Sequence, residues 1–275
     1  MKSKKKIIIF IAAVILTALI LVLVCRQKSN TAYDSGSENL PVLVIGSDTY
    51  KPYNYFDSSG STVGIDVDIA KEACKRIGYR PVFKHIQWDE KDELLASGEI
   101  DCIWGSFSMN GRENDYNWAG PYLFGNQSVM VRASSKIYTL SDLADKNISV
   151  QVTSKPEQIF LNSELNERIP KVKKVYCFSE LSEAFAALMK GYTDACAGHE
   201  TALKAISAQS GTAYRILPEP IMTSEIGVAF LKGKDSDAQK KLEKAFSDMK
   251  KDSAISKILE QYGIYSEKMI GGDGN

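Results

Sequence analysis

The sequence has few residues of the kinds that hold metal ions or exchange disulfides. Its 275 residues include two histidines and five cysteines, and no two cysteines have the CxxC spacing of zinc or thioredoxin-like motifs. The histidines, His85 and His199, lie too far apart in the sequence to predict a metal site. Cys102, Cys177 and Cys196 occur in apolar, strand-like segments, so we expect them to be buried as small hydrophobic side chains. The sequence therefore predicts no metal and no cofactor.

The sequence also lacks the excess of positive charge that nucleic-acid binding requires. It has 34 basic and 34 acidic residues, and six of the basic residues precede Ser29. After that point 28 basic residues stand against 34 acidic ones, which is a net charge of −6. This balance excludes nucleic acid as a partner.

The longest apolar run lies near the N-terminus. Residues 7–24 are apolar apart from Thr17, and four lysines precede them. The run is longer than the core of a usual signal peptide and slightly shorter than a typical membrane-spanning helix. Cys25 follows directly, as in a bacterial lipoprotein signal, although Val24 is bulkier than the small residue that normally precedes that cysteine. We predict that residues 1–25 are a signal or membrane-anchor segment, with Cys25 as a possible lipidation site.

The lysines before the apolar run favour a cytoplasmic start, so the rest of the chain is expected on the outer face of the cell membrane. Residues 26–39 are almost all polar or charged, which is typical of a flexible tether. The folded part is expected to begin near Leu40 and to contain about 230 residues, enough for one large domain or two smaller ones.

Strand and helix signals alternate through the folded part. Strands are predicted at 42–45, 82–86, 100–104, 148–152, 172–178, 195–197 and 226–231. Helices are predicted at 66–77, 89–98, from 155, 179–190, 201–209 and from 235. Such alternation predicts two α/β lobes whose sheets are covered by helices on both faces. In open α/β sheets the ligand binds beyond the carboxyl ends of the strands, so the residues that follow each strand are the candidates for a site.

Four candidates follow the first two strands. Asp48, Tyr50 and Tyr53 can form an aromatic wall with an acidic group for a cation, or an ordinary Asp/Pro turn. Trp88 follows the second strand and fits a cleft wall as well as a core position.

The segment after the third predicted strand has the donors that a carboxylate needs. It contributes Gly105, Ser106, Phe107, Ser108 and Arg112. Its small residues expose backbone N–H groups, two hydroxyls add further donors, and the planar guanidinium matches the two oxygens of a carboxylate. The alternative is a surface Arg112 that pairs with Glu113 or Asp115.

Two further segments belong to the second half of the chain. The candidates there are Gln151, Thr153, Ser154, Lys155, His199 and Glu200. Hydroxyls and a lysine before a helix suit an anion, although a plain helix cap explains them too. A carboxylate at Glu200 can meet an ammonium group, and it also suits the first turn of a helix.

Taken in order, these segments resemble the polar-amino-acid family of bacterial extracellular solute-binding proteins (family 3), which serve ABC-type importers. The resemblance covers residues 40–267. It rests on Gly46-Ser47-Asp48, Pro52-Tyr53, Gly64-Ile65-Asp66-Val67-Asp68-Ile69-Ala70, Gly98-Glu99-Ile100-Asp101, Arg112, Gly120-Pro121-Tyr122, Ser141-Asp142-Leu143, Gly191-Tyr192-Thr193-Asp194-Ala195 and Gly227-Val228-Ala229-Phe230.

The resemblance implies an α/β, two-lobed, periplasmic-binding-protein-like fold of type 2. Each lobe is then a mixed sheet flanked by helices, and two hinge strands cross near 122–126 and 221–226. Lobe 1 comprises residues 40–123 and 225–270, and lobe 2 comprises residues 124–224.

The resemblance also implies roles for the candidates. Arg112 matches the arginine that binds the carboxylate of the ligand. Asp48, Tyr50 and Trp88 match positions of the pocket for the ligand's side chain. Gln151 and the turn at 153–155 match the loop that completes the carboxylate site. Three departures from the family stand out: a serine-containing segment at 106–109 in place of threonines, Thr153-Ser154-Lys155 in place of a glycine-threonine turn, and His199 in place of the aspartate that usually binds the ammonium. We expect Glu200 to replace that aspartate.

The function implied is that of a monomeric, non-enzymatic protein that captures a free polar or charged amino acid outside the membrane. It would deliver the amino acid to a permease and its ATPase subunits. One alternative is a cyclohexadienyl dehydratase-like enzyme on the same fold, with Glu200 or His199 in proton transfer. Another is a sensor ectodomain, which usually has a C-terminal membrane span, whereas residues 270–275 form a polar tail. Asp48 and Glu200 suit a cationic side chain, and a neutral polar amino acid or cystine fits as well.

Overall fold

The computed structural model describes residues 39–162, 166–265 and 267–271. Their helices and strands all lie in one compact unit, Pro41–Asn275. The predicted signal or anchor segment, Cys25 and nearly all of the predicted tether lie outside the described residues. Within the described ranges, no helix has the length and apolar character needed to cross a membrane.

The strands are β1 (Val42–Ser47), β2 (Tyr55–Phe56), β3 (Thr62–Val63), β4 (Arg80–His85), β5 (Cys102–Ser108), β6 (Tyr116–Arg132), β7 (Asn147–Gln151), β8 (Lys174–Phe178), β9 (Ala195–His199), β10 (Tyr214–Ile216) and β11 (Met222–Leu231). The helices are α2 (Ile65–Ile77), α3 (Lys91–Ser97), α4 (Lys155–Leu161), α5 (Leu181–Met189), α6 (Glu200–Ser207), α7 (Asp237–Lys251), α8 (Ala254–Gln261) and α9 (Lys268–Gly271), with 3-10 turns η1 (Trp88–Glu90) and η2 (Ser141–Leu143).

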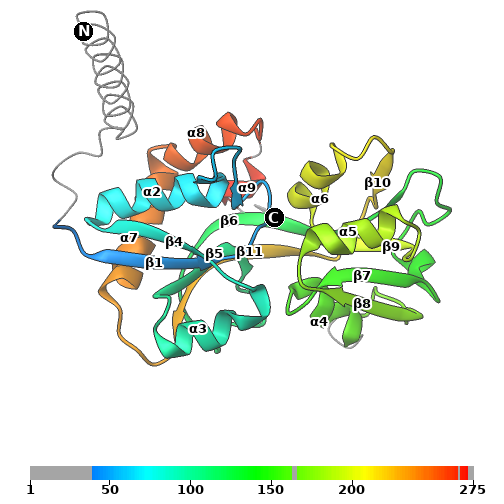
Figure 1. The fold of residues 1–275 in the computed structure, drawn as a ribbon, viewed down its shortest axis with the longest axis horizontal. Coiled ribbons are helices and arrows are strands. Elements are labelled where there is room, and N and C mark those ends of the chain that lie inside the picture. Colours follow the sequence, from blue (N-terminus) through cyan, green and yellow to red (C-terminus); the bar gives the residue numbers. More distant parts are fainter. Residues whose placement is uncertain (1–38, 163–165, 266, 272–275) are drawn as a thin grey trace, which may run out of the picture. The chain divides into compact units, whose positions relative to one another are not determined.

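One sheet runs through the described residues in the order β4-β1-β5-β11-β6-β9-β7-β8, and β10 pairs with β6 (Figure 1). At one end β1 pairs in parallel with β4 and β5, and at the other end β7 pairs in parallel with β8 and β9. Between them β6 and β11 are antiparallel to each other and to their outer neighbours. We call β1, β4 and β5 with α2, α3, α7 and α8 the first half, and β7 to β10 with α4 to α6 the second half. The expected α/β architecture, with mixed parallel and antiparallel strands flanked by helices, is confirmed.

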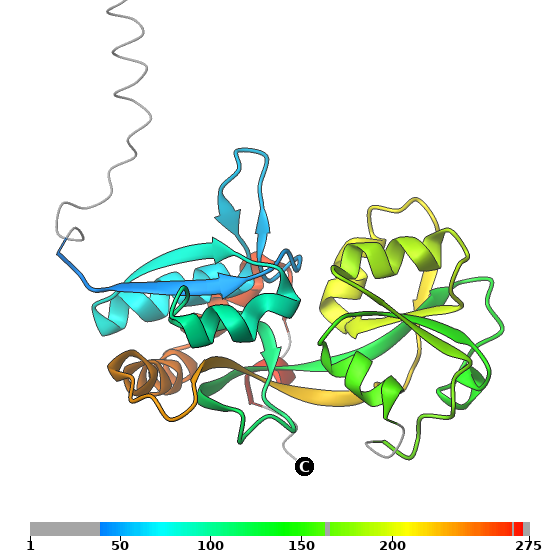
Figure 2. The same cartoon turned by 60° about the horizontal axis from the view of Figure 1, so that its bottom comes forward.

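The two halves share only the antiparallel pair β6 and β11 as continuous strands (Figure 2). The N-terminal part of β6 pairs with β11, and its C-terminal part pairs with β9 and β10. The sequence signals missed most of β6, because Gly120, Pro121 and Gly125 interrupt an otherwise strand-like segment. The run predicted as one helix from 235 is three helices, and it breaks at Ser253, whose φ is +62°.

Helices cover both faces of the sheet in each half, as the alternation predicted. In the first half, α2, α7 and α8 pack on one face, and α3 packs on the other through Leu95. In the second half, Leu181 and Leu188 of α5 lie on one face, and Ile159 and Phe160 of α4 lie on the other. Gly78 ends α2 at φ +74°, the left-handed conformation that a helix C-terminus favours in glycine.

The predicted burial of the cysteines is correct for Cys102 and Cys196 and wrong for Cys177, which is exposed. Cys177 lies on β8, the last strand in the sheet order, whose residues are all half-buried or exposed. The apolar neighbours in the sequence did not reveal this, because they alternate with Cys177 across the strand.

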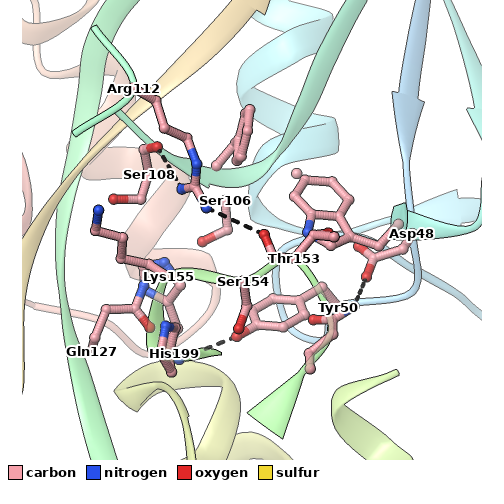
Figure 3. Close-up of a pocket in the computed structure, with 15 residues that line it drawn as sticks. Asp48, Tyr50, Ser106, Ser108, Arg112, Gln127, Thr153, Ser154, Lys155 and His199 are labelled. Carbon is pink, nitrogen blue, oxygen red and sulfur yellow. Dashed lines mark hydrogen bonds between the residues drawn. The ribbon is translucent and has the colours of Figure 1, made fainter. Parts of the chain in front are cut away.

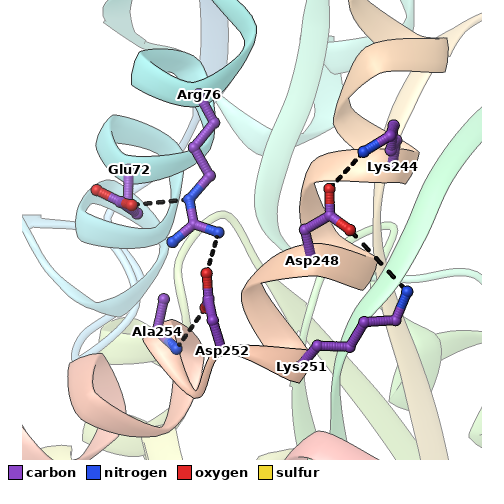
Figure 4. A network of polar contacts seen from close by, with 7 residues as sticks. All are labelled: Glu72, Arg76, Lys244, Asp248, Lys251, Asp252 and Ala254. Atoms are coloured by element: carbon purple, nitrogen blue, oxygen red, sulfur yellow. Dashed lines mark hydrogen bonds and ion pairs between the residues drawn. The ribbon is translucent and has the colours of Figure 1, made fainter.

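A polar network joins α2 to the turn between α7 and α8 (Figure 4). The Nε of Arg76 lies 2.8 Å from Glu72 Oε1, and its Nη1 lies 2.6 Å from Asp252 Oδ2. Asp252 Oδ1 also accepts a hydrogen bond from the backbone N–H of Ala254 (3.1 Å). The network therefore links α2 to the turn that joins α7 and α8.

We expect Arg76→Ala to lower the free energy of unfolding by less than about 1 kcal/mol, because solvent and salt screen exposed ion pairs. The side chains of Arg76 and Asp252 are 26% and 50% exposed. Urea unfolding tests this expectation, with Lys244→Ala as the control because Lys244 pairs only within α7. A loss of several kcal/mol would show that the network contributes far more than its exposure allows.

Candidate ligand-binding site

A cavity of about 380 Å³, part of it open to solvent, lies where the two halves meet (Figure 3). Thirteen of the fifteen predicted site residues line it. They are Asp48, Tyr50, Trp88, Gly105, Ser106, Phe107, Ser108, Arg112, Gln151, Thr153, Ser154, Lys155 and His199. Gln127 and Pro156 also line the cavity, and the sequence did not single them out. Tyr53 and Glu200 are absent from the lining.

The strands bring these residues together from distant parts of the chain. Asp48 follows the carboxyl end of β1, and Gln151 and His199 are the last residues of β7 and β9. The carboxyl ends of parallel strands meet at one edge of a sheet, which is where ligands bind in open α/β folds. β5 extends further than expected, to Ser108, so the residues at 105–108 belong to the strand and do not follow it.

Arg112 is buried beside the cavity and is only 6% exposed. Its Nη1 donates to the carbonyl oxygen of Ser108 and its Nη2 donates to that of Thr153, each at 3.2 Å. Its guanidinium lies 5.0 Å from the centre of the Phe107 ring. Glu113, the expected partner of a surface arginine, instead accepts from the backbone N–H of Gly111. The guanidinium thus donates to one neutral carbonyl oxygen from β5 and one from the second half. An anionic ligand that displaces these two carbonyls makes stronger, charge-assisted hydrogen bonds with the guanidinium.

Two lysines add positive charge near Arg112. Lys91, which the sequence gave no reason to choose, is 3% exposed, and its Nζ donates to Thr153 Oγ1 (3.0 Å) and lies 5.3 Å from the Trp88 ring centre. Burial lowers the pKa of Lys91, and burial together with the charge of Arg112 lowers the pKa of Lys155. Arg112 and Lys155 line the cavity, and Lys91 lies behind it with Asp92 as an ion-pair partner (3.5 Å). The positive charge on this side of the cavity favours an anionic group there.

Two hydrogen bonds close the opposite side of the cavity. The Nε2 of Gln151 donates to Asp48 Oδ2 (2.5 Å), and the backbone N–H of His199 donates to Tyr50 Oη (3.1 Å). Burial raises the pKa of Asp48 to about 6, although the bond from Gln151 acts against this. Each bond joins the first half to the second, so the two halves are in contact around the cavity.

Trp88 is both a wall of the cavity and a core residue. It is 6% exposed, and its ring packs edge-on against Phe107 with the centroids 5.2 Å apart. Ser154 likewise fills both of the roles considered for it: it lines the cavity, and its Oγ accepts from the backbone N–H of Glu157 as the N-cap of α4.

Tyr53 and Glu200 lie away from the cavity. Tyr53 is fully buried behind it, with its ring centre 5.7 Å from that of His199. Glu200 begins α6, where it pairs with Lys204 and accepts from Ser128 Oγ (3.2 Å). A carboxylate in the first turn of a helix is stabilised there by the helix dipole and by a lysine four residues on. The residue expected to meet an ammonium group is therefore turned away from the site.

Two lining residues have a strained backbone. Ser106 and Thr153 have φ values of +51° and +53°, which cost about 1–3 kcal/mol in residues other than glycine. The backbone N–H of Ser106 donates to Asp66 Oδ2 (2.6 Å), and that of Thr153 donates to Glu157 Oε2 (2.6 Å). Carboxylates outside the lining thus hold the strained residues in place.

Asp66 is itself buried, and its Oδ1 accepts from Tyr122 Oη (2.8 Å). Burial raises its pKa to about 7, against the opposing hydrogen bonds from Tyr122 and Ser106. The sequence offered Asp66 only as part of a motif and gave no sign of its support for the site.

Comparison with known proteins identifies the family. The model of the bacterial extracellular solute-binding proteins, family 3, matches residues 42–264. The chain belongs to this family, as the resemblance of its motifs predicted. It is 24% identical over 266 residues to the probable amino-acid-binding protein YxeM of Bacillus subtilis (strain 168), with 95% of this chain and 96% of the relative covered.

Three solved structures extend the comparison. An ancestral arginine-binding protein, solved with glutamine and with arginine bound, is 30% identical, with TM-scores of 0.71 and 0.72 and coverage of 80% of this chain and 97% of that one. An ancestral amino-acid-binding protein described as a precursor of cyclohexadienyl dehydratase is 25% identical, with a TM-score of 0.71 and coverage of 80% and 95%.

Proposed function

We propose that this family member captures a free amino acid in the cavity and delivers it to the permease of an ABC-type importer. The observation that carries the proposal is Arg112, a buried guanidinium beside the cavity whose hydrogen bonds within the described residues go to neutral carbonyl oxygens. A buried charge needs a partner to be stable, and a carboxylate fits the guanidinium fork. The amino-acid-binding names of the relatives support the same assignment.

Capture works through closure of two lobes, residues 40–123 with 225–270 and residues 124–224, about β6 and β11. Arg112 and Asp48 come from one lobe, and Thr153, Lys155 and His199 come from the other. A ligand that touches both groups binds the closed form better than the open one and so shifts the population toward it. This differential binding supplies the signal that a permease can recognise.

The protein works outside the cytoplasmic membrane, held there by its N-terminal helix or by lipid on Cys25. It acts as a monomer, and its partners are the permease and the ATPase subunits. The charged groups in the lining suit a polar or charged amino acid, with Asp48 and Tyr50 toward the side chain of the ligand.

A binding role fits the site better than the enzymatic alternative does. A general acid or base must reach the substrate in a suitable protonation state. Glu200 lies outside the lining, and burial lowers the pKa of His199 to about 4, so His199 is neutral at neutral pH and does not act as a general acid. Turnover of prephenate or arogenate by the purified protein would support the enzyme instead.

A thermal-shift screen of the chain from Leu40 onward against free amino acids tests the proposal. An amino acid present at 100 times its dissociation constant is expected to stabilise the fold by about 2.7 kcal/mol. The 2-hydroxy acids of the same side chains serve as controls for weak anion binding. If no amino acid raises the melting temperature, the capture function is wrong.

A further inference from the structure

Several buried polar atoms of the cavity lining lack a hydrogen-bond partner. Among the described residues, these atoms include Ser106 Oγ, Gln127 Oε1 and both ring nitrogens of His199. The three residues are 6%, 3% and 4% exposed. A buried polar group without a partner costs about 1–3 kcal/mol, and most such groups in folded proteins are paired. Because these atoms lie around one cavity, a ligand bound in the cavity is the natural hydrogen-bond partner for them.

The sheet places these residues next to one another. Gln127 of β6 stands opposite His199 of β9 in the antiparallel register. Ser106 comes from β5 in the other half, and Figure 3 shows all three residues on the left of the cavity, away from Asp48.

Gln127 is held by a residue of β11. Its Nε2 donates to Ser224 Oγ (3.2 Å), and Ser224 also accepts from Ser108 Oγ (3.2 Å). Ser224 lies on β11 and is fully buried. Because the amide nitrogen is engaged with Ser224, the oxygen of Gln127 is the end left free. The carbonyl of Ser108 in turn accepts from Arg112, so the free oxygen is linked to the carboxylate partner through two serines.

All three free groups are neutral acceptors. Burial lowers the pKa of His199 to about 4, against a smaller opposing effect of the Ser106 backbone. A neutral imidazole has one nitrogen with a lone pair, and the hydroxyl and amide oxygens accept as well. An ammonium group has three donors and no acceptor, so the two sets are complementary.

We propose that Gln127, oriented by Ser224, forms with Ser106 and His199 a neutral acceptor site for the ammonium group of the amino acid. The inference rests on the proposed function. An amino acid carries its ammonium one carbon from its carboxylate, so the ammonium site must adjoin Arg112. Gln127 meets this need, because Ser224 and Ser108 link it to Arg112 through hydrogen bonds. Gln127 and His199 thus take the place expected for Glu200.

A selectivity measurement tests the inference on the full chain in detergent. The probes are the amino acid with the largest thermal shift and the 2-hydroxy acid with the same side chain. Calorimetric titration gives the ratio of their affinities. Gln127→Met removes the acceptor at similar volume and is expected to reduce the preference for the amino acid roughly 10-fold, as for loss of one hydrogen bond to a charged group.

A second variant reverses the effect. Gln127→Glu places a carboxylate beside the ammonium and is expected to raise the same preference roughly 10-fold. The control is Gln239→Glu, because Gln239 bonds Trp118 in the first half and does not line the cavity. It should leave the ratio unchanged.

Ser224→Ala provides the answer if Gln127→Met does not fold. It keeps Gln127 but removes the hydroxyl that orients its amide. The preference for the amino acid over the 2-hydroxy acid should therefore fall by a few-fold, while the contacts of Arg112 with the ligand carboxylate remain. If a folded variant at Gln127 weakens both probes equally, Gln127 only shapes the cavity and the inference is wrong while the capture function stands. If no amino acid binds the unchanged protein, the capture function itself fails and this inference with it.

Discussion

Replacing Arg112 by alanine is expected to weaken amino-acid binding roughly 100- to 10,000-fold. Each hydrogen bond between a charged donor and a charged acceptor contributes about 1.5–3 kcal/mol, and the guanidinium can offer two of them to one carboxylate. Arg112 is buried, so in the alanine variant water does not effectively replace the guanidinium as the hydrogen-bond donor to the ligand carboxylate. Calorimetric titration of the variant with the amino acid found in the screen measures the loss.

Two further variants make the result specific. Arg112→Lys keeps the charge and loses the planar fork, so its affinity should lie between those of the unchanged protein and the alanine variant. Arg215→Ala is the matched control, because Arg215 also donates to two backbone carbonyls, those of Ile137 (2.8 Å) and Ser135 (2.9 Å), but lies outside the lining. Binding to Arg112→Ala with unchanged affinity would remove the carboxylate assignment.

The substitution Asp66→Asn is expected to remove the pH dependence that this buried carboxyl imposes on stability. Burial raises the pKa of Asp66 from 3.8 to about 7. The unfolded chain loses this proton above about pH 4, whereas the folded protein keeps it to about pH 7. Stability from this group is therefore fully present below pH 4 and declines as the pH rises to 7, by at most about 4 kcal/mol.

Asparagine reproduces the protonated carboxyl, since its oxygen can accept from Ser106 and its amide can donate to Tyr122. We expect Asp66→Asn to gain stability over the unchanged protein at both pH values, with a smaller gain at pH 5, where part of the decline has occurred, and a larger gain at pH 8, where the decline is complete. Urea unfolding at the two pH values measures the difference. Asp237→Asn is the control: the pKa of Asp237 is lowered, mainly by Lys241, so this carboxyl is ionised at both pH values and its loss should not change the pH 5 to pH 8 difference. An equal loss at both pH values in Asp66→Asn would contradict the buried, protonated state.

The sequence predicted residues well where a strand leads directly into the site. Asp48 follows β1, and Thr153 to Lys155 follow β7, so the order of strands was enough to nominate them. Their presence around one cavity depends on parallel strands that end at a common edge, which alternation of strands and helices implies. The family motifs added the expectation that Arg112 faces inward.

The sequence failed where contacts between distant strands decide the outcome. Gln127 lies in the middle of the long strand β6, and only its register with β9 brings it opposite His199. Glu200 looked suitable because it follows His199, but the start of α6 turns it toward Lys204. Lys91 and Asp66 contact residues of the site through tertiary packing. The sequence next to each of them carries no signal of these contacts.

The most direct test is a crystal structure of the chain from Leu40 onward with the bound amino acid from the screen. The account predicts the amino acid in the cavity between the halves, with its carboxylate on the guanidinium of Arg112 and its nitrogen within hydrogen-bond distance of Gln127 Oε1. An amino acid bound outside this cavity, or one whose carboxylate contacts Lys155 and leaves Arg112 on the carbonyls of Ser108 and Thr153, would contradict it.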